Sequence, residues 1–328
     1  MKTESPSPPF KDYNKIINPK IAVIIPCYNE EAAIGRVIAD FRSELPYAEI
    51  YVFDNNSTDR TAEIAHQSGA IVSFEKRQGK GNVVKSMFRK VDADIYIMVD
   101  GDTTYPANRV HDMLNPVLKG EADMVVGSRL LSKSSYMKLL NRIGNWLFLT
   151  SLNTVFGTGL TDILSGYRVM TREFVRGVPV FSEGFQIETE LTIQALHHRM
   201  RVVEVPVTLS KRPDGGESKI RILSDGLKIS WMILDLFRTY KPLTFFGGIG
   251  LMLIAIGIFL GIGIVREFLQ TGLVPRFPTA ILATALVLSG LLAISVGLIL
   301  NTLSRSFREI YYHIMLVDRR LNDKHSSE

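Results

Sequence analysis

Short apolar runs alternate with helix-like stretches over the first two-thirds of the chain. The runs cover residues 21–25, 49–53, 70–74, 95–99, 122–126 and 201–207. Uninterrupted apolar runs of this length are typical of strands that are buried on both faces. Helical patterns separate them, at 31–43, after residue 59, from 78–82 to 90, at 136–156 and from 183 to 198. Alternating strands and helices with short connections predict an α/β domain with a mostly parallel sheet.

The chain after residue 219 has a different pattern. Residues 220–241 are amphipathic, whereas 243–265 and 279–303 contain no charged residue, and each is about long enough to cross a bilayer. This pattern predicts an interfacial juxtamembrane helix, a hairpin of two transmembrane helices and a C-terminal tail at 304–328. Small residues in each span (Gly257 with Gly261, Ala293 with Gly297) would let helices approach closely and permit a homo-oligomer.

Composition supports a soluble part and a membrane part in one chain. The 328 residues are 46% hydrophobic and 22% charged, with a formal net charge of +5. The mild positive charge suits anionic lipid or phosphorylated substrates, and no nucleic-acid-binding motif accompanies it. Cys27 is the single cysteine, which excludes an internal disulfide and a cysteine-rich metal site.

The N-terminus and the basic residues predict the topology. Residues 1–20 have no apolar core, so they predict a flexible tail and no signal peptide. Basic residues follow the second span in larger number than they occur in the connector between the spans; those in the tail are Arg305, Arg308, Arg319, Arg320 and Lys324. The positive-inside rule then places both termini and the first domain in the cytoplasm, on the cytoplasmic membrane.

Polar segments follow the predicted strands and predict one binding site. They are 26–30, 54–59, 100–102 and Arg129. Ligands of open α/β sheets bind at the carboxyl ends of the strands, where these segments converge. The first strand is followed by Pro-Cys-Tyr-Asn-Glu and not by G-x-G-x-x-G, which argues against a dinucleotide-dependent oxidoreductase.

Asp100 and Asp102 are the most informative pair. They end an apolar run and are separated by Gly101, which allows the backbone to bend or approach a ligand. Two carboxylates that face one point require a cation, and a divalent metal holding a phosphate-bearing ligand satisfies this. Considered alone, the pair slightly favours a solvated Asp-Gly turn over a metal site.

Taken together and in order, the motifs resemble glycosyltransferase family 2, and most closely its polyprenyl-phosphate glycosyltransferases. That group contains dolichyl-phosphate mannose and glucose synthases and bacterial undecaprenyl-phosphate glucosyltransferases. The matching segments are 26–30, 54–59, 77–82, 100–102, 127–129, 165–168 and 216–219. The resemblance implies a GT-A, Rossmann-like catalytic domain over residues 21–219, a nucleotide-sugar donor, and Mg²⁺ or Mn²⁺.

The resemblance also implies roles for individual residues. The nucleotide sugar would be bound by Pro26, Tyr28, Glu30, Asp54, Lys80 and Asp100. Asp100 and Asp102 would hold the metal. The acceptor phosphate would be met by Arg129, Ser165, Arg168, Arg212 and Lys219. The segment 211–219 fits either a mobile lid over phosphates or a solvated surface loop. Asp162 and Glu188 are candidate general bases, each with an alternative structural role.

The resulting hypothesis is a membrane-bound enzyme that transfers one sugar, with inversion, from a nucleotide sugar to a polyprenyl phosphate. Family analogy favours UDP-glucose and leaves GDP-mannose open. One alternative is a processive polysaccharide synthase, but neither Trp146 nor Trp231 follows an arginine as the Gln-x-x-Arg-Trp motif of such enzymes requires. A second alternative is a non-enzymatic membrane scaffold that binds lipid-linked sugars, which loss of the aspartate pair would have favoured.

Overall fold

The computed structural model describes residues 19–129, 149–209 and 234–325, apart from 151, 155, 183, 185, 186, 236 and 237. These residues form two compact units. The first contains 19–129 and 158–209, and the second contains 149–157 and 234–325. The predicted N-terminal tail, most of the predicted helix at 136–156 and most of the juxtamembrane segment at 220–241 lie outside the described residues.

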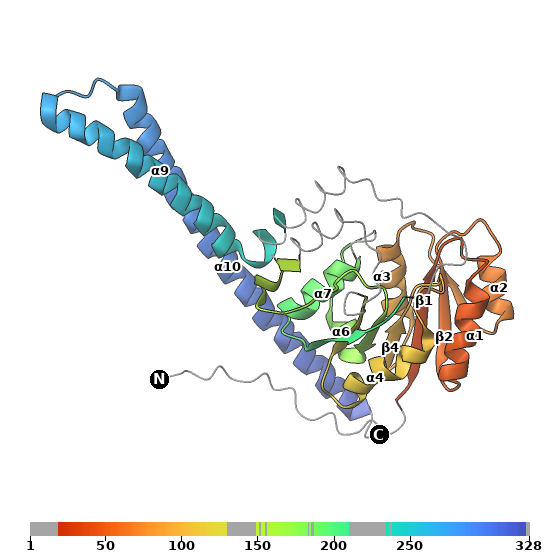
Figure 1. The fold of residues 1–328 in the computed structure, drawn as a ribbon. Coiled ribbons are helices and arrows are strands. Elements are labelled where there is room, and N and C mark those ends of the chain that lie inside the picture. The colour runs from red at the N-terminus through yellow and green to blue at the C-terminus, as the bar shows by residue number, and fades with distance from the viewer. Residues whose placement is uncertain are drawn as a thin grey trace. The chain divides into compact units, whose positions relative to one another are not determined.

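The described part of the first unit contains one mixed sheet of seven strands in the order β3-β2-β1-β4-β6-β5-β7 (Figure 1). The strands are β1 (Ile21–Cys27), β2 (Glu49–Asp54), β3 (Ile71–Phe74), β4 (Ile95–Met98), β5 (Met124–Ser128), β6 (Arg168–Thr171) and β7 (Val202–Pro206). Strand β6 is antiparallel to β4 and β5, and the other neighbouring strands are parallel. The predicted mostly parallel α/β sheet is therefore confirmed.

Strand β6 lies where the sequence suggested the end of a polar loop. Its first residue, Arg168, and its last, Thr171, are both buried, and both form hydrogen bonds within the protein. Only Val169 and Met170 between them are apolar. A strand with polar residues at its buried ends leaves an apolar run too short to detect.

Helices cover both faces of the sheet and close two cores. Helices α1 (Ile34–Glu44), α2 (Thr61–Gln67) and α4 (Val110–Leu118) bury one face, and α3 (Lys80–Lys90), α6 (Arg172–Gly177) and α7 (Ile187–His197) bury the other. Strand β1 serves both cores, because Val23 and Ile25 face the first and Ala22 and Ile24 the second. This explains why its sequence is apolar at consecutive positions.

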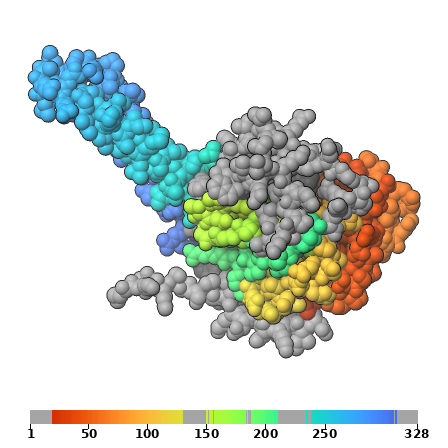
Figure 2. All heavy atoms as spheres, viewed as in Figure 1, coloured from red at the N-terminus to blue at the C-terminus, as the bar shows by residue number. Residues whose placement is uncertain are grey.

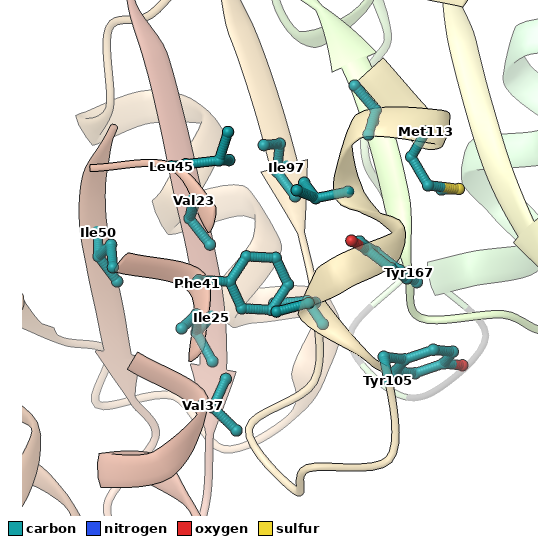
Figure 3. Close-up of a cluster of buried hydrophobic side chains, with 14 of the residues drawn as sticks. Val23, Ile25, Val37, Phe41, Leu45, Ile50, Ile97, Tyr105, Met113 and Tyr167 are labelled. Carbon is teal, nitrogen blue, oxygen red and sulfur yellow. The ribbon is translucent and has the colours of Figure 1, made fainter. Parts of the chain in front are cut away.

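Three aromatic rings join the first core to the edge of the sheet where the polar segments lie (Figure 3). The ring of Tyr167 packs edge-on against Phe41 of α1, with centroids 6.1 Å apart, and is tilted against Tyr105, with centroids 5.6 Å apart. Tyr105 follows Asp102 by three residues, and Tyr167 immediately precedes β6. The loops that carry the polar motifs are thus anchored by large buried side chains, each of which contributes about 1.5–3 kcal/mol through burial.

The second unit is dominated by two long helices, α9 (Pro242–Thr271) and α10 (Phe277–His325). The most apolar stretches of 18 residues within 242–271 and 277–307 have mean hydropathies of 2.6 and 2.4. Both helices expose large apolar side chains on their outer surfaces, the cyan and blue parts of Figure 2. These helices are the two predicted candidate membrane spans. Helix α10 continues through the segment that the sequence assigned to a tail.

Small residues spaced by seven bring α9 and α10 together. A Cβ added to Gly250 would lie 2.6 Å from the carbonyl oxygen of Gly290, and one added to Gly257 would lie 2.8 Å from that of Ala283. Gly297 follows Gly290 by seven residues and meets Phe246. A period of seven is typical of helices that wind around one another with a left-handed supercoil. A Cβ at Gly261, which the sequence paired with Gly257, would meet no described atom within 4 Å apart from the backbone of its own helix.

We predict that Gly290→Ala loosens this hairpin and that Gly261→Ala does not. The new methyl group at 290 would collide with the Gly250 carbonyl and with Ile254, which should cost about 1–3 kcal/mol. The matched change at 261 meets open space and gains helix propensity. Hydrogen-exchange mass spectrometry in detergent micelles should show faster exchange in α9 and α10 for the first variant only. Equal exchange in both variants would contradict the assigned contact.

Candidate active site

The loops that follow β1 and β2 are interlocked by hydrogen bonds. The amide of Asn29 donates to Ser57 Oγ at 3.0 Å, and the amide of Thr58 donates back to Asn29 Oδ1 at 2.8 Å. The amide of Glu30 donates to Thr61 Oγ1 at 2.8 Å. Asn29 adopts φ of 56°, a left-handed conformation that asparagine tolerates better than most residues. These two strand ends therefore present one connected rim.

Asn55 ties this rim to the start of helix α3. Its Nδ2 donates to the carbonyl oxygens of Glu75 and Arg77 at 2.9 and 2.8 Å, and its Oδ1 accepts from the amide of Gly79 at 2.7 Å. Gly79 has φ of 124°, which favours glycine, and the helix begins at the next residue, Lys80. The loop after β3 is thereby fixed so that Lys80 enters the site.

The residues assigned from sequence to the nucleotide lie on the rim. Tyr28 is 51% exposed, and Pro26 and Glu30 are half-buried. Asp54 ends β2 opposite Cys27 of β1 and is buried. Its Oδ2 accepts from the amide of Ser57 at 3.1 Å, whereas its buried Oδ1 has no hydrogen-bond partner among the described residues. A buried carboxylate oxygen in this state requires a donor to satisfy it.

Asp100 and Asp102 lie just beyond the carboxyl end of β4. Strands β2 and β3 lie on one side of β1 and β4 lies on its other side, so the pair sits at the topological switch point of the sheet. Asp102 Oδ1 accepts from the amide of Thr104 at 3.1 Å and from the Thr104 hydroxyl. Gly101 packs on Cys27, since a Cβ there would lie 2.7 Å from Sγ. Glycine at this position lets the acidic loop rest directly on β1.

Lys80 lies between Asp100 and Glu188. Its Nζ is 2.5 Å from Asp100 Oδ1 and 2.5 Å from Glu188 Oε1. Burial lowers the pKa of the Lys80 ammonium, but the two carboxylates outweigh this and raise that pKa above its ordinary value. The sequence had placed Lys80 beside the nucleotide and Glu188 among the candidate bases. The structure joins them through a single ammonium group.

The charges around Asp100 suit a divalent cation. The carboxylates of Asp100 and Glu188 flank one ammonium, and Asp102 adds a third carboxylate two residues after Asp100, so negative charge is in excess. Among the described residues no group of three or more His, Cys, Asp or Glu side chains is arranged to hold a metal by itself. Asp100 and Asp102 can supply two hard oxygen ligands, and phosphate oxygens and water supply the others in many Mg²⁺ sites. The donor set therefore fits a metal that binds together with a diphosphate.

Arg129 follows β5 and is held by Asp162. Its Nε and Nη2 donate to Asp162 Oδ2 and Oδ1 at 2.7 and 2.9 Å, and its amide donates to Oδ2 at 2.9 Å. The Asp162 side chain is 1% exposed and that of Arg129 is 28% exposed. Burial lowers the pKa of the guanidinium, and Asp162 more than compensates and raises it. Asp162 thus fixes a cation whose outer edge reaches solvent.

The segment 165–168 forms the wall beside Asp100. The amide of Gly166 donates to the Tyr105 hydroxyl at 2.9 Å, and Ser165 Oγ lies 3.3 Å from the same oxygen. A Cβ at Gly166 would collide with the carboxylate of Asp100. Ser165 is fully buried, so in this structure it braces the wall.

Arg168 is fully buried beneath this wall. Its guanidinium donates to the carbonyl oxygens of Ile163, Ser165 and Glu188 and to the hydroxyl of Thr192. Burial lowers its pKa to about 10. The sequence resemblance had implied that Arg168 meets an acceptor phosphate. In this structure its donors serve the loop at 163–165 and the start of α7.

Comparison with known proteins identifies the family. Residues 22–178 match the sequence pattern of the family described as Glycosyl transferase family 2. Glycosyltransferase AglJ of Haloferax volcanii is 32% identical over 294 residues, which are 88% of this chain and 95% of that protein. The chain belongs to glycosyltransferase family 2. A dolichyl-phosphate hexose transferase of the same organism is 32% identical over 215 residues, covering 65% of this chain and 92% of the relative.

Solved structures support the GT-A fold. Glucosyl-3-phosphoglycerate synthase of Mycobacterium tuberculosis, in complex with Mn²⁺, uridine diphosphate and its glucosylated product, superposes with a TM-score of 0.54. The match covers 68% of this chain and 80% of the synthase at 26% identity. The predicted GT-A catalytic domain is thus confirmed. The synthase also shows that this fold can bind a divalent metal together with a nucleoside diphosphate.

The structure brings together most of the residues that the sequence singled out. Direct contacts join Lys80 with Asp100 and Glu188, and Arg129 with Asp162. Arg212 and Lys219 lie outside the described residues. Sequence reasoning missed Tyr105, which braces the wall beside Asp100, although its place three residues after Asp102 was a usable signal.

We predict that Gly166→Ala impairs sugar transfer strongly while the domain still folds. The added methyl group would displace the Asp100 carboxylate, and misplacing a reacting or binding group by about 1 Å can reduce rates roughly 100-fold. Gly159→Ala is the matched control, because a Cβ there meets no atom of the described residues within 4 Å. Transfer rates and circular dichroism of both variants test this. Wild-type activity in Gly166→Ala would show that the wall does not fix Asp100.

Proposed function

We propose that this chain transfers a single hexose from a nucleoside-diphosphate sugar to a polyprenyl phosphate at the cytoplasmic face of a membrane. The observation that carries the proposal is the acidic pair Asp100 and Asp102, flanked by Lys80, in a family 2 domain that two apolar helices follow. The similarity to a dolichyl-phosphate hexose transferase supports the lipid phosphate as acceptor.

The donor would lie across the rim formed by the ends of β1, β2 and β4. Asp54 offers a buried carboxylate oxygen that no described residue satisfies. An imino N–H of uracil or guanine would satisfy it, whereas the corresponding ring nitrogen of cytosine is an acceptor. Tyr28, Pro26 and Glu30 border this position and would contact the base and ribose. The uridine diphosphate bound by the mycobacterial synthase supports a UDP-sugar, with UDP-glucose as first choice and GDP-mannose compatible.

Asp100 and Asp102 would hold Mg²⁺ or Mn²⁺ against the donor diphosphate. The bound metal would supply charge neutralisation for the departing nucleoside diphosphate. Thr104 orients Asp102, and Lys80 orients Asp100 and adds a second positive charge close by. Preorganised charges of this kind stabilise a transition state because they need no rearrangement when the bond breaks.

Arg129 would bind the acceptor phosphate. Arginine recognises phosphate through paired N–H donors, and Asp162 already holds one edge of this guanidinium in place. A phosphate oxygen would attack the anomeric carbon as the bond to the diphosphate breaks, which inverts the configuration. We place Arg212 and Lys219 in the same role, and Ser165 and Arg168 as supports of the wall.

This mechanism needs no separate general base. A phosphate monoester is already anionic near neutral pH, so its oxygen can attack directly. Asp162 and Glu188, the two candidate bases, are each committed to a cation, Arg129 and Lys80 respectively. We therefore assign both acids a positioning role. The basic residues after the second span, such as Arg305, support a cytoplasmic location for the catalytic domain.

We predict that the double variant Asp100→Asn, Asp102→Asn loses sugar transfer by at least roughly 1000-fold and still inserts into membranes. Loss of both carboxylates removes the protein's metal ligands. The bound metal would contribute several kcal/mol of transition-state stabilisation, and that contribution would be lost. The assay measures transfer of labelled sugar to undecaprenyl phosphate by purified protein in lipid nanodiscs. Normal turnover in the double variant would overturn the metal assignment.

A second aspartate pair with the same spacing provides the control. Asp92 and Asp94 flank Ala93 at the opposite, amino end of β4, where they form ion pairs with Arg172. The double variant Asp92→Asn, Asp94→Asn should lower thermal stability and keep the turnover of the folded protein. If both double variants lost turnover equally, the effect would be due to impaired folding and not to loss of the metal ligands.

A further inference from the structure

Glu204 stands out in strand β7 because its neighbours on both sides are valines. It lies opposite Val126 in the register with β5, on the sheet face that also carries Val202. A carboxylate at such a position has a desolvation cost unless hydrogen bonds compensate it. The sequence showed only a strand with one acidic interruption, and neither the donor nor the metal proposal uses Glu204.

The carboxylate of Glu204 accepts hydrogen bonds from Thr161 and Asp162. The amide of Thr161 lies 2.9 Å from both Oε1 and Oε2, and the Thr161 hydroxyl donates to Oε2 at 2.9 Å. The amide of Asp162 donates to Oε1 at 2.7 Å. Ser128, the neighbour of Arg129, lies 2.9 Å from the Thr161 hydroxyl. One charged group therefore fixes the backbone of two consecutive residues.

Asp162 transmits this placement to Arg129. It accepts the Nε and Nη2 donors of Arg129 on its two oxygens, and both its backbone and its side chain are thus held. No described residue accepts a hydrogen bond from Arg129 Nη1, so that edge of the guanidinium can bind an anion. A shift of the loop would turn this edge away from its ligand.

We propose that Glu204 is a positioning residue that aims Arg129 at the phosphate of the acceptor. The inference rests on the proposed function, because it assigns Arg129 to the lipid phosphate. Glu204 does not touch the substrate. Its effect is to hold Asp162 through backbone hydrogen bonds, so that the guanidinium is fixed before the acceptor arrives.

The chain contains a matched control for this arrangement. At the opposite end of the β5–β7 pair, Asp123 accepts from the amide, Nε and Nη2 of Arg201 at 2.7, 3.2 and 2.8 Å. This is the same three-bond pattern that Asp162 forms with Arg129. A purely structural function predicts similar consequences for disrupting either arrangement. A positioning function predicts that only the arrangement held by Glu204 affects the acceptor.

The test compares Glu204→Gln with Asp123→Asn. Glutamine keeps the shape of glutamate but places an N–H₂ donor against the Thr161 amide in either orientation, because that amide lies 2.9 Å from both oxygens of Glu204. For Glu204→Gln, KM for undecaprenyl phosphate should rise about tenfold at unchanged KM for the nucleotide sugar. Asp123→Asn should lower the melting temperature and change neither KM. Binding of undecaprenyl phosphate by the purified protein, with undecaprenol as the uncharged control, measures the same effect without sugar transfer.

A mutant cycle with Arg129→Lys separates the possible outcomes. If Glu204 acts through Arg129, adding Glu204→Gln to Arg129→Lys should raise the acceptor KM by less than twofold. An undiminished tenfold effect in that background, or an unchanged acceptor KM in the single variant, would overturn the inference. If Glu204→Gln fails to fold, Thr161→Val removes the hydroxyl bonds to Glu204 and Ser128, keeps the two backbone bonds to Glu204, and should raise the acceptor KM about threefold. Wild-type protein that neither binds nor uses the lipid phosphate would instead refute the proposed function.

Discussion

The site depends on the two ion pairs that the Lys80 ammonium group forms. This group separates two carboxylates, Asp100 and Glu188, that come from different parts of the chain and would otherwise repel one another. All three side chains are largely withdrawn from solvent, and loss of one partner from a buried ion pair costs about 3–5 kcal/mol. These three side chains link helix α3, the loop after β4 and the start of α7. The position of Asp100, and with it the geometry of the pair Asp100 and Asp102, therefore rests on contacts between residues that are distant in sequence.

A second charge arrangement organises the other side of the site. Arg129 is aligned by Asp162, whose loop is held in turn by Glu204 of the edge strand β7. The two arrangements share one principle: Asp100 and Glu188 hold Lys80 in a fixed position, and Asp162 does the same for Arg129. Such preorganisation lets a cation meet phosphate without rearrangement. The wall between them, Ser165 to Arg168, is braced by Tyr105 and by the buried guanidinium of Arg168.

Much of this fold could be predicted from local sequence, and the exceptions have physical causes. Strands β1 and β4 are buried on both faces, so their sequences are continuously apolar and easily detected. Strand β6 begins at Arg168 and ends at Thr171, two polar residues whose partners are distant in sequence. The identities of Asp100, Asp102 and Lys80 followed from motifs. The pairing of Lys80 with Glu188 and the function of Glu204 depend on tertiary contacts, which no spacing in the sequence encodes.

The mass of the lipid product tests the proposed reaction most directly. Purified protein in nanodiscs is incubated with undecaprenyl phosphate and UDP-glucose, and the extracted lipid is analysed by mass spectrometry with and without EDTA. The proposed reaction predicts undecaprenyl phosphate that carries one hexose, formed only when a divalent metal is present. Polymeric product, or the same single-hexose lipid at full yield in EDTA, would contradict it.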